Sequence, residues 1–248
     1  MTKTLDLNAD LGEGCASDAE LMALVTSCNI ACGGHAGDAK SMRTALQQAR
    51  ENGVAAGAHP SFPDRENFGR SRMDLAGPDL ENSLRDQVQA LRALADELDV
   101  TLTHLKPHGA LYNMAASDVE LARSILRVHM ETMGDAALFG PPKCKLQQAS
   151  EAQGVRYIAE GFADRAYERD GTLRDRKLIG AVLHDPKDQT EQAISIATRQ
   201  QVQTVDGEKI ALPAQTLCVH GDTPTALTAA RAIRSALEAK GIFLCPPN

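Results

Sequence analysis

Four histidines in this chain share a setting, because each follows a short apolar run and stands in a segment broken by glycine or proline. They are His35 in NIACGGHAGD, His59 in VAAGAHPSFPD, His108 in THLKPHGALYN and His220 in LCVHGDTP. A fifth segment of the same form, YIAEGFADR, contributes Glu160, Asp164 and Arg165. Imidazole and carboxylate groups transfer protons and bind metal ions. Five such segments at separate strand ends predict one polar site built from the whole length of the chain.

The segment NADLGEG places Asn8 close to two carboxylates, Asp10 and Glu13. Two carboxylates near one strand end can bind a metal ion or act as a general base. A solvated turn whose acids cap the next helix would explain the same residues equally well. The segment alone therefore leaves both interpretations open.

The segment CGGHAGD contains Gly33, Gly34 and Gly37, which allow the backbone to approach a ligand closely. We expect a helix to begin near Asp38, and a helix N-terminus offers free N–H groups to an anion. These features predict an anion-binding loop that includes His35. An ordinary glycine-rich connection is the alternative.

Lys106 has the same strand parity as His104, so both side chains are expected to point into the fold. A lysine in that position is costly unless it meets an anion, which predicts a phosphate or carboxylate partner. A lone histidine after a strand is more often a structural residue than a ligand. The turn-forming neighbours of His59 and His108 nevertheless favour a role in the site.

The segment EGFADRAYERDGTLRDR is rich in arginine, whose planar guanidinium suits carboxylate and phosphate groups. We assign anion binding to Arg165, together with Glu160 from the same segment. We interpret the later arginines as a surface charge network, namely Arg169, Arg174 and Arg176. In VHGDTP, His220 is a site residue, and Asp222 either joins the site or only caps the next helix.

The histidines and carboxylates could also assemble a metal site. The candidate ligands are Asp10, His35, His59 and His108. Neither an HExxH nor an HxH pair occurs, so the spacing identifies neither the metal nor its ligand set.

Short apolar strands alternate with amphipathic helices along the chain. We predict core strands at 4–9, 28–32, 54–58, 101–106, 136–140, 155–160 and 216–219, and an extra strand at 209–212. We predict helices that begin near residues 17, 38, 79, 117, 143, 185 and 223. Ser17 with Glu20, and Ser117 with Glu120, predict side-chain caps at two of these helices.

About seven strand–helix units predict an α/β fold, a (β/α) barrel that takes residues 1–248 as a single domain. An open doubly wound sheet is the alternative. It loses support because neither a GxGxxG segment nor a Walker-type loop is present.

The composition restricts the partners of the protein. A formal net charge of −7 argues against nucleic acid or an anionic membrane as the main partner. Aromatic residues make up 3% of the chain and Trp is absent, which argues against stacking on sugars or bases. The acidic N-terminal segment does not resemble a signal peptide, and no apolar run approaches the ~20 residues of a membrane span. We therefore expect a cytoplasmic protein with reduced thiols.

Six segments taken together resemble, in order, the motifs of the LamB/YcsF family, which is also called the 5-oxoprolinase A-type subunit family. They are DLNADLGEG, NIACGGHAGD, GAHPSFPD followed by FGR, KPHGALYN, EGFADRAYERDGTLRDR and CVHGDTP. The resemblance implies a barrel related to the glycoside hydrolase/deacetylase fold. It also implies ATP-dependent opening of 5-oxo-L-proline to L-glutamate, performed with two further subunits. ATP, with Mg²⁺, would be a co-substrate of the complex, and a bound divalent metal is compatible with the site.

That reaction suggests roles for the residues. Phosphorylation of the amide oxygen would turn it into a leaving group, and water would then attack the ring carbon. On this hypothesis Asp10 or Glu13 is the base, and His59 and His108 polarise the substrate or bind a metal. The substrate and phosphate would be bound by Asn8, Gly33, Gly34, His35, Gly37, Lys106, Glu160, Arg165, His220 and Asp222.

Two functions of other classes remain as alternatives. A stand-alone metal-dependent amidase or carbohydrate deacetylase would hold a divalent metal and would not need ATP. A non-catalytic binding subunit would leave the complex active after point changes at Asp10 or His59.

Overall fold

The computed structural model describes residues 3–247, and seven parallel strands of that range close into a barrel. They are β1 (Lys3–Leu11), β2 (Ser27–Ala31), β3 (Ala55–His59), β4 (Leu102–Leu105), β5 (Ala137–Gly140), β6 (Tyr157–Phe162) and β9 (Thr216–Val219). Each strand pairs with the next, and β1 pairs with both β2 and β9. That last pairing closes the sheet, so the predicted barrel of about seven strands is confirmed and the open sheet is excluded.

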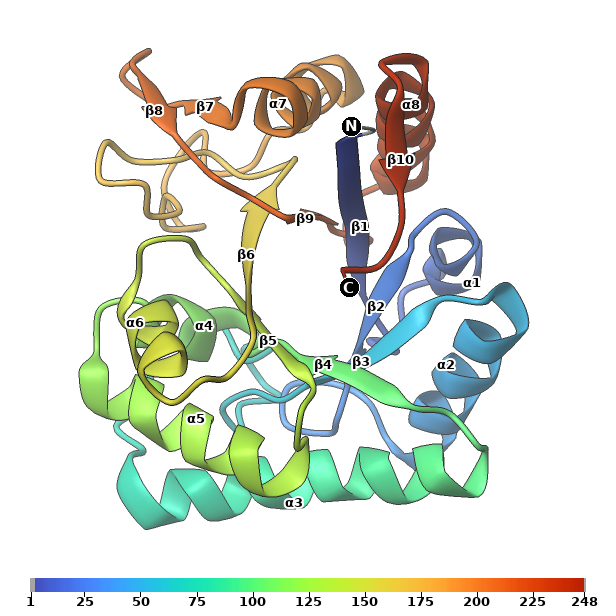
Figure 1. Ribbon diagram of the computed structural model, residues 1–248, viewed down its shortest axis with the longest axis vertical. Coiled ribbons are helices and arrows are strands. Elements are labelled where there is room, and N and C mark those ends of the chain that lie inside the picture. The colour runs from blue at the N-terminus through green and yellow to red at the C-terminus, as the bar shows by residue number, and fades with distance from the viewer. Residues whose placement is uncertain (1–2, 248) are drawn as a thin grey trace.

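The helices lie around the strands (Figure 1). They are α1 (Asp18–Met22), α2 (Ala39–Asn52), α3 (Gly77–Glu97), α4 (Gly109–Ala115), α5 (Val119–Thr132), α6 (Lys145–Ala152), α7 (Pro186–Arg199) and α8 (Ala226–Ala239). In α3, the longest of them, Leu80, Leu84, Val88 and Leu91 form one buried stripe. Burying each such side chain stabilises the fold by about 1.5–3 kcal/mol, which fixes the face that α3 turns to the barrel. No helix within residues 3–247 is both long and apolar enough to cross a membrane.

Three further strands lie outside the barrel. The chain between β6 and β9 forms a small antiparallel hairpin from β7 (Gln201–Gln203) and β8 (Lys209–Ala211). The second of these confirms the extra strand predicted at 209–212. After α8, β10 (Ile242–Leu244) pairs in parallel with the start of β1 at Lys3–Leu5. Neither β7 nor β10 was predicted. Each is three residues long and follows the preceding helix after only one or two residues.

Two predicted helix caps were wrong. Ser17 makes no side-chain cap at α1, and its hydroxyl instead donates to the carbonyl of Gly221, 3.2 Å away. At α5 the cap is Asp118 rather than Ser117, because the Asp118 carboxylate accepts from the backbone N–H groups of Glu120 and Leu121. The short helix α4 was also missed, since its seven residues begin with Gly109 immediately after a turn.

The inside of the barrel is polar near the site, and β1 shows why. Its residues alternate, with Leu5, Leu7 and Ala9 in the hydrophobic core and Asp6, Asn8 and Asp10 buried on the opposite face. Side chains from opposite strands meet there. The Asn8 amide donates to Glu160 Oε1 of β6 at 3.0 Å, and Asn29 of β2 donates to Asn8 Oδ1 at 2.8 Å. This ladder of hydrogen bonds holds the carboxylates of the site in place.

Candidate active site

A cavity of about 640 Å³ opens at the carboxyl ends of the barrel strands. Its wall includes Asp10 near the end of β1, His59 at the end of β3, Lys106 just after β4 and His220 just after β9. In α/β barrels this face carries the active site, because every strand ends there with a loop. The strand-end histidines and Asp10, far apart in the chain, are therefore brought together as predicted.

Lys106 lies at the floor of this cavity with 2% of its surface exposed. Its Nζ is 2.9 Å from Asp10 Oδ1 and 2.8 Å from Glu160 Oε1. Burial works against the charged ammonium, but the neighbouring Asp10, Cys218 and Glu160 together outweigh it, so the pKa of Lys106 is well above its usual value. The anions predicted for Lys106 are thus carboxylates of the chain itself.

Asp10 is held on both oxygens. Oδ1 accepts from Asn29 and Lys106, and Oδ2 is 3.3 Å from His59 Nε2. Burial raises the pKa of Asp10, but its contact with His59, the charge of Lys106 and the nearby His220 together lower it by more and leave it well below the usual value. A carboxylate with so low a pKa is a weak base. Asp10 therefore suits orientation and charge stabilisation better than the base role predicted for it.

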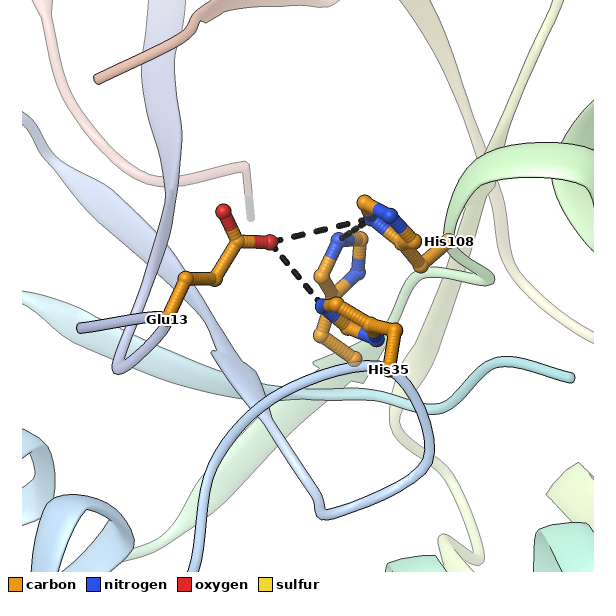
Figure 2. Close-up of side chains that lie close together, drawn as sticks. Glu13, His35 and His108 are labelled. Atoms are coloured by element: carbon orange, nitrogen blue, oxygen red, sulfur yellow. Dashed lines mark hydrogen bonds and ion pairs between the residues drawn. The ribbon is translucent and has the colours of Figure 1, made fainter. Parts of the chain in front are cut away.

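Four residues beside Asp10 form what we call the histidine cluster. Its members are Glu13, His35, His59 and His108, and one ligand atom from each lies within 4.8 Å of all the others. Figure 2 shows Glu13 facing the parallel rings of His35 and His108, whose centroids are 3.7 Å apart. Glu13 Oε1 lies 3.0 Å from His35 Nε2 and 3.7 Å from His108 Nδ1. Burial lowers the pKa of His35, and burial together with the neighbouring His35 and His59 lowers that of His108 well below its usual value.

Backbone carbonyls fix the orientation of two of these rings. His59 Nδ1 is 2.7 Å from the carbonyl oxygen of Lys106, and His108 Nε2 is 3.0 Å from that of Phe68. Each of these nitrogens must donate, because a carbonyl only accepts. The other nitrogens, His59 Nε2 and His108 Nδ1, face each other at 2.9 Å.

A second group that could hold a metal contains Asp10, Cys218 and His220. Cys218 is buried, and burial raises the pKa of its thiol well above the usual value. A cysteine binds metal as the thiolate. Of the two groups, the histidine cluster is therefore the better fit to a metal ion.

His220 and Asp164 form a pair on the other side of Asp10. His220 Nδ1 is 2.7 Å from one Asp164 oxygen and 3.0 Å from the other. Burial raises the pKa of Asp164, but His220 together with Arg176 and Arg165 lowers it by more, so the carboxylate stays ionised. Because Nδ1 donates to Asp164, Nε2 is left on the cavity side, 3.9 Å from Asp10 Oδ2. This is the arrangement of a histidine that transfers protons.

The mouth of the cavity is lined with arginine. Asp222 accepts from Arg70 at 2.7 Å and from Arg176 at 3.2 Å, which ties three loops together. Arg176 therefore lies at the site, not in the surface network predicted for it. Asp222 does not cap α8, whose N-cap residue is Thr225. Arg165 donates to the carbonyl groups of residues 174 and 181, and its predicted contact with an anion stays a prediction.

The glycine loop does not form the predicted anion site at the start of α2. The side chain of Asp38 accepts from the backbone N–H of Ser41 and so occupies the helix N-terminus. The carbonyl groups of Gly33 and Gly37 accept from Arg65. Gly34 is required for packing instead, because a Cβ there would lie 2.5 Å from the Ser61 hydroxyl oxygen.

Several residues of the site were not predicted, among them Arg70 and Arg72 at the cavity mouth. Asn29 bridges Asn8 and Asp10, and a polar residue inside the apolar strand at 28–32 was the signal for it. Tyr112 lines the cavity with a buried hydroxyl that has no hydrogen-bond partner among the described residues. Phe68 packs edge-on against the rings of His35 and His108.

Comparison with known proteins gives matches over nearly the whole chain. The sequence profile of the LamB/YcsF family matches residues 5–248. A solved structure, the lactam utilization protein from Thermus thermophilus, is 36% identical, with a TM-score of 0.90 over 98% of this chain and 99% of that one.

Two deacetylases have a similar fold at low sequence identity. The T48 deacetylase, solved with substrate, is 16% identical, with a TM-score of 0.51 over 98% of this chain and 87% of that one. The polysaccharide deacetylase Bc1974 from Bacillus cereus is 12% identical, with a TM-score of 0.51 over 99% of this chain and 92% of that one. These two similarities concern the barrel alone.

Proposed function

The chain belongs to the LamB/YcsF family, and on that premise we propose that it is the ring-opening subunit of an ATP-dependent 5-oxoprolinase. The complex would hydrolyse the lactam of 5-oxo-L-proline to L-glutamate. A role in lactam utilization is supported by the family and by the 36% identity to the Thermus thermophilus protein. The assignment of ring opening to this barrel rests on the chemistry of its cavity.

The Asp164–His220 pair beside the Asp10–Lys106 ion pair is the observation that carries the proposal. Water must lose a proton as it attacks the ring carbon, and the ring nitrogen must gain one as the C–N bond breaks. If the ring oxygen carries the phosphoryl group, this cleavage leaves an acyl phosphate, which a second water hydrolyses to the carboxylate of L-glutamate and inorganic phosphate. His220 Nε2 faces the cavity and is oriented through Nδ1 by Asp164. It can therefore accept the first proton and deliver the second. The Lys106 ammonium, paired with Asp10 and Glu160, holds both carboxylates in place at the cavity floor.

The charge of the cavity mouth fits an anionic substrate. Arg70, Arg72 and Arg176 line the opening, and 5-oxo-L-proline carries a carboxylate at neutral pH. A lactam activated by phosphorylation would carry still more negative charge. Guanidinium groups bind both carboxylates and phosphates through paired hydrogen bonds.

We assign ATP and its Mg²⁺ to the complex rather than to this barrel. The loop predicted to bind phosphate has its helix N-terminus occupied by the carboxylate of Asp38. In this proposal two partner subunits use ATP to activate the lactam, and this barrel completes the hydrolysis. An activity assay tests this division of labour. We expect activity when the three subunits are mixed and none from any one subunit alone.

A stand-alone metal-dependent amidase or carbohydrate deacetylase is the second candidate. The histidine cluster and the deacetylase-like barrel favour it. It predicts hydrolysis without ATP and loss of activity with a chelator. The third candidate, a binding subunit without chemistry, predicts that changes in the cavity leave the complex active.

The decisive experiment measures L-glutamate and ADP release from 5-oxo-L-proline and ATP by the reconstituted complex. We expect His220→Asn and Asp164→Asn to lower turnover by about 10²–10⁴-fold while the circular dichroism spectrum is unchanged. His184→Asn is the matched control, because His184 is exposed and does not line the cavity. Near-normal turnover of folded His220→Asn would refute the proposed proton transfer.

A further inference from the structure

We propose that the histidine cluster binds one divalent transition-metal ion through its three imidazoles and the carboxylate of Glu13. The proposal concerns this chain alone. It does not depend on the identity of the lactam, and it is separate from the Mg²⁺ that accompanies ATP.

The orientation of two rings carries the inference. His59 donates from Nδ1 to the carbonyl of Lys106, and His108 donates from Nε2 to the carbonyl of Phe68. In their neutral forms, the two rings therefore direct lone pairs from His59 Nε2 and His108 Nδ1 toward each other at 2.9 Å. Two lone pairs at that distance repel unless they share a cation. Histidine ligands in metal sites are oriented in this way, with the second ring nitrogen donating to a carbonyl or carboxylate.

The local charge also favours a cation. Three buried carboxylates, from Asp10, Glu13 and Glu160, lie around the cluster, and one ammonium group, Lys106, lies among them. Asp10 and Glu160 share that ammonium group. Glu13 contacts only imidazoles among the charged or titratable side chains of the described chain. A divalent ion beside Glu13 would balance the remaining negative charge.

The third ring completes the ligand set. His35 would bind through Nε2, which lies 3.0 Å from Glu13 Oε1. The other nitrogen of the ring, the buried Nδ1, has no hydrogen-bond partner within residues 3–247. Ligands on one ion at bond lengths of about 2.1 Å lie at most about 4.2 Å apart. The four ligand atoms, all within 4.8 Å of one another, need to move only slightly to meet that limit.

The donor types select the class of metal. Three imidazole nitrogens and one carboxylate oxygen suit Zn²⁺, Co²⁺ and related ions. Mg²⁺ and Ca²⁺ prefer oxygen ligands, so they should bind this cluster weakly. Zn²⁺ is the ion that we expect, and Co²⁺ is its spectroscopic substitute.

The segment Phe68–Gly69 is shaped to serve the cluster. Phe68 adopts a φ of 56°, which is rare for a residue with a side chain, and this conformation accompanies the placement of its carbonyl on His108. Its ring covers His35 and His108 from outside. A Cβ on Gly69 would lie 2.9 Å from the Cβ of His35, so the covering segment fits only with glycine at that position.

The test is metal binding by the isolated full-length chain, with neither ATP nor a lactam present. Chelator-treated protein is titrated with Co²⁺ and followed by visible absorption, and then with Zn²⁺ by calorimetry. We expect one equivalent to bind, and we expect His108→Ala and Glu13→Gln to weaken binding by about 100-fold or more. Glu13→Gln preserves side-chain volume, so it reports on the site even if His108→Ala does not fold.

Two control variants separate the possible outcomes. His184→Ala removes an exposed histidine and should bind Co²⁺ as the unaltered chain does. His220→Ala removes a member of the second group and should bind within a few-fold of the unaltered chain. Loss of binding in His220→Ala but not in Glu13→Gln would place the metal elsewhere and overturn the proposal. The absence of a Co²⁺ spectrum in the folded, unaltered chain would overturn it as well, and would leave a shared proton between His59 and His108.

Discussion

Replacing Lys106 with methionine tests whether the ion pairs at the cavity floor support the fold. The change keeps most of the side-chain volume and removes the ammonium from between Asp10 and Glu160. At an effective dielectric constant of about 20, each attraction over 2.8–2.9 Å amounts to about 6 kcal/mol before desolvation. Desolvation cancels much of this. Removing one partner leaves two buried carboxylates close together, and we expect a loss of about 3–5 kcal/mol in the free energy of unfolding.

The assay is urea unfolding at pH 7, followed by far-UV circular dichroism, with the single and double variants in one cycle. Glu160→Gln removes one of the stranded charges and still offers an oxygen to Asn8, which donates to Glu160 at 3.0 Å. Lys106→Met combined with Glu160→Gln should therefore be more stable than Lys106→Met alone, by about 1–3 kcal/mol. If Lys106→Met costs less than about 1 kcal/mol, or if the two changes add without coupling, the reasoning is wrong.

Three more outcomes follow from the structure. Burial raises the pKa of Asp6 from 3.8 to about 6, so the folded protein binds more protons than the unfolded chain between those values and loses stability as the pH rises through them. Asp6→Asn should remove that loss. The free energy of unfolding of the variant, relative to that of the unaltered chain, should therefore rise by about 3 kcal/mol between pH 4 and pH 7. If urea unfolding gives a difference between the two proteins that does not change with pH, the prediction is wrong. Gly69→Ala should cost more stability than Gly154→Ala, by about 1–3 kcal/mol in thermal or urea unfolding. Both glycines have a positive φ, near 65° and 70°, but only the first would meet the histidine cluster; equal costs would refute the clash. Arg176→Ala should raise the KM for the anionic lactam about 10-fold with kcat nearly unchanged, while Arg169→Ala, an exposed change, should alter neither; a fall in kcat alone would show a different role.

The barrel could be predicted because its strands and helices carry strong local patterns. The alternation in β1 and the leucine stripe of α3 are set by burial, and the sequence records burial directly. The approach of Asp10, His59 and His220 also followed from the sequence, since strand ends meet on one face of a barrel. The short elements that were missed lie close to a neighbouring element. Three residues separate the helix α4, of seven residues, from the end of β4, and two residues separate the strand β10, of three residues, from the end of α8.

The partners inside the site could not be predicted in the same way. Strand parity shows that Lys106 points inward, but the residues that it meets come from β1 and β6, and only the stagger of the closed barrel determines that. Arg176 lies in a long loop without periodicity, so nothing in the sequence distinguishes it from the exposed Arg169. The prediction of an anion site at the glycine loop was wrong because Asp38, which we predicted as the start of the helix, supplies the carboxylate that occupies the helix N-terminus.

Closure of the barrel through β1 and β9 has a consequence for how the molecule is made. Asp6 and Thr216, paired across that seam, are 210 residues apart in the chain. Contacts between residues so far apart in the sequence form late, because closing the long loop between them costs conformational entropy. During synthesis on the ribosome, one edge of β1 therefore stays unpaired until β9 has emerged, and an unpaired strand edge promotes aggregation. His220 leaves the ribosome in the same stretch as β9, so a nascent chain would complete its barrel and the Asp164–His220 pair in a single late step.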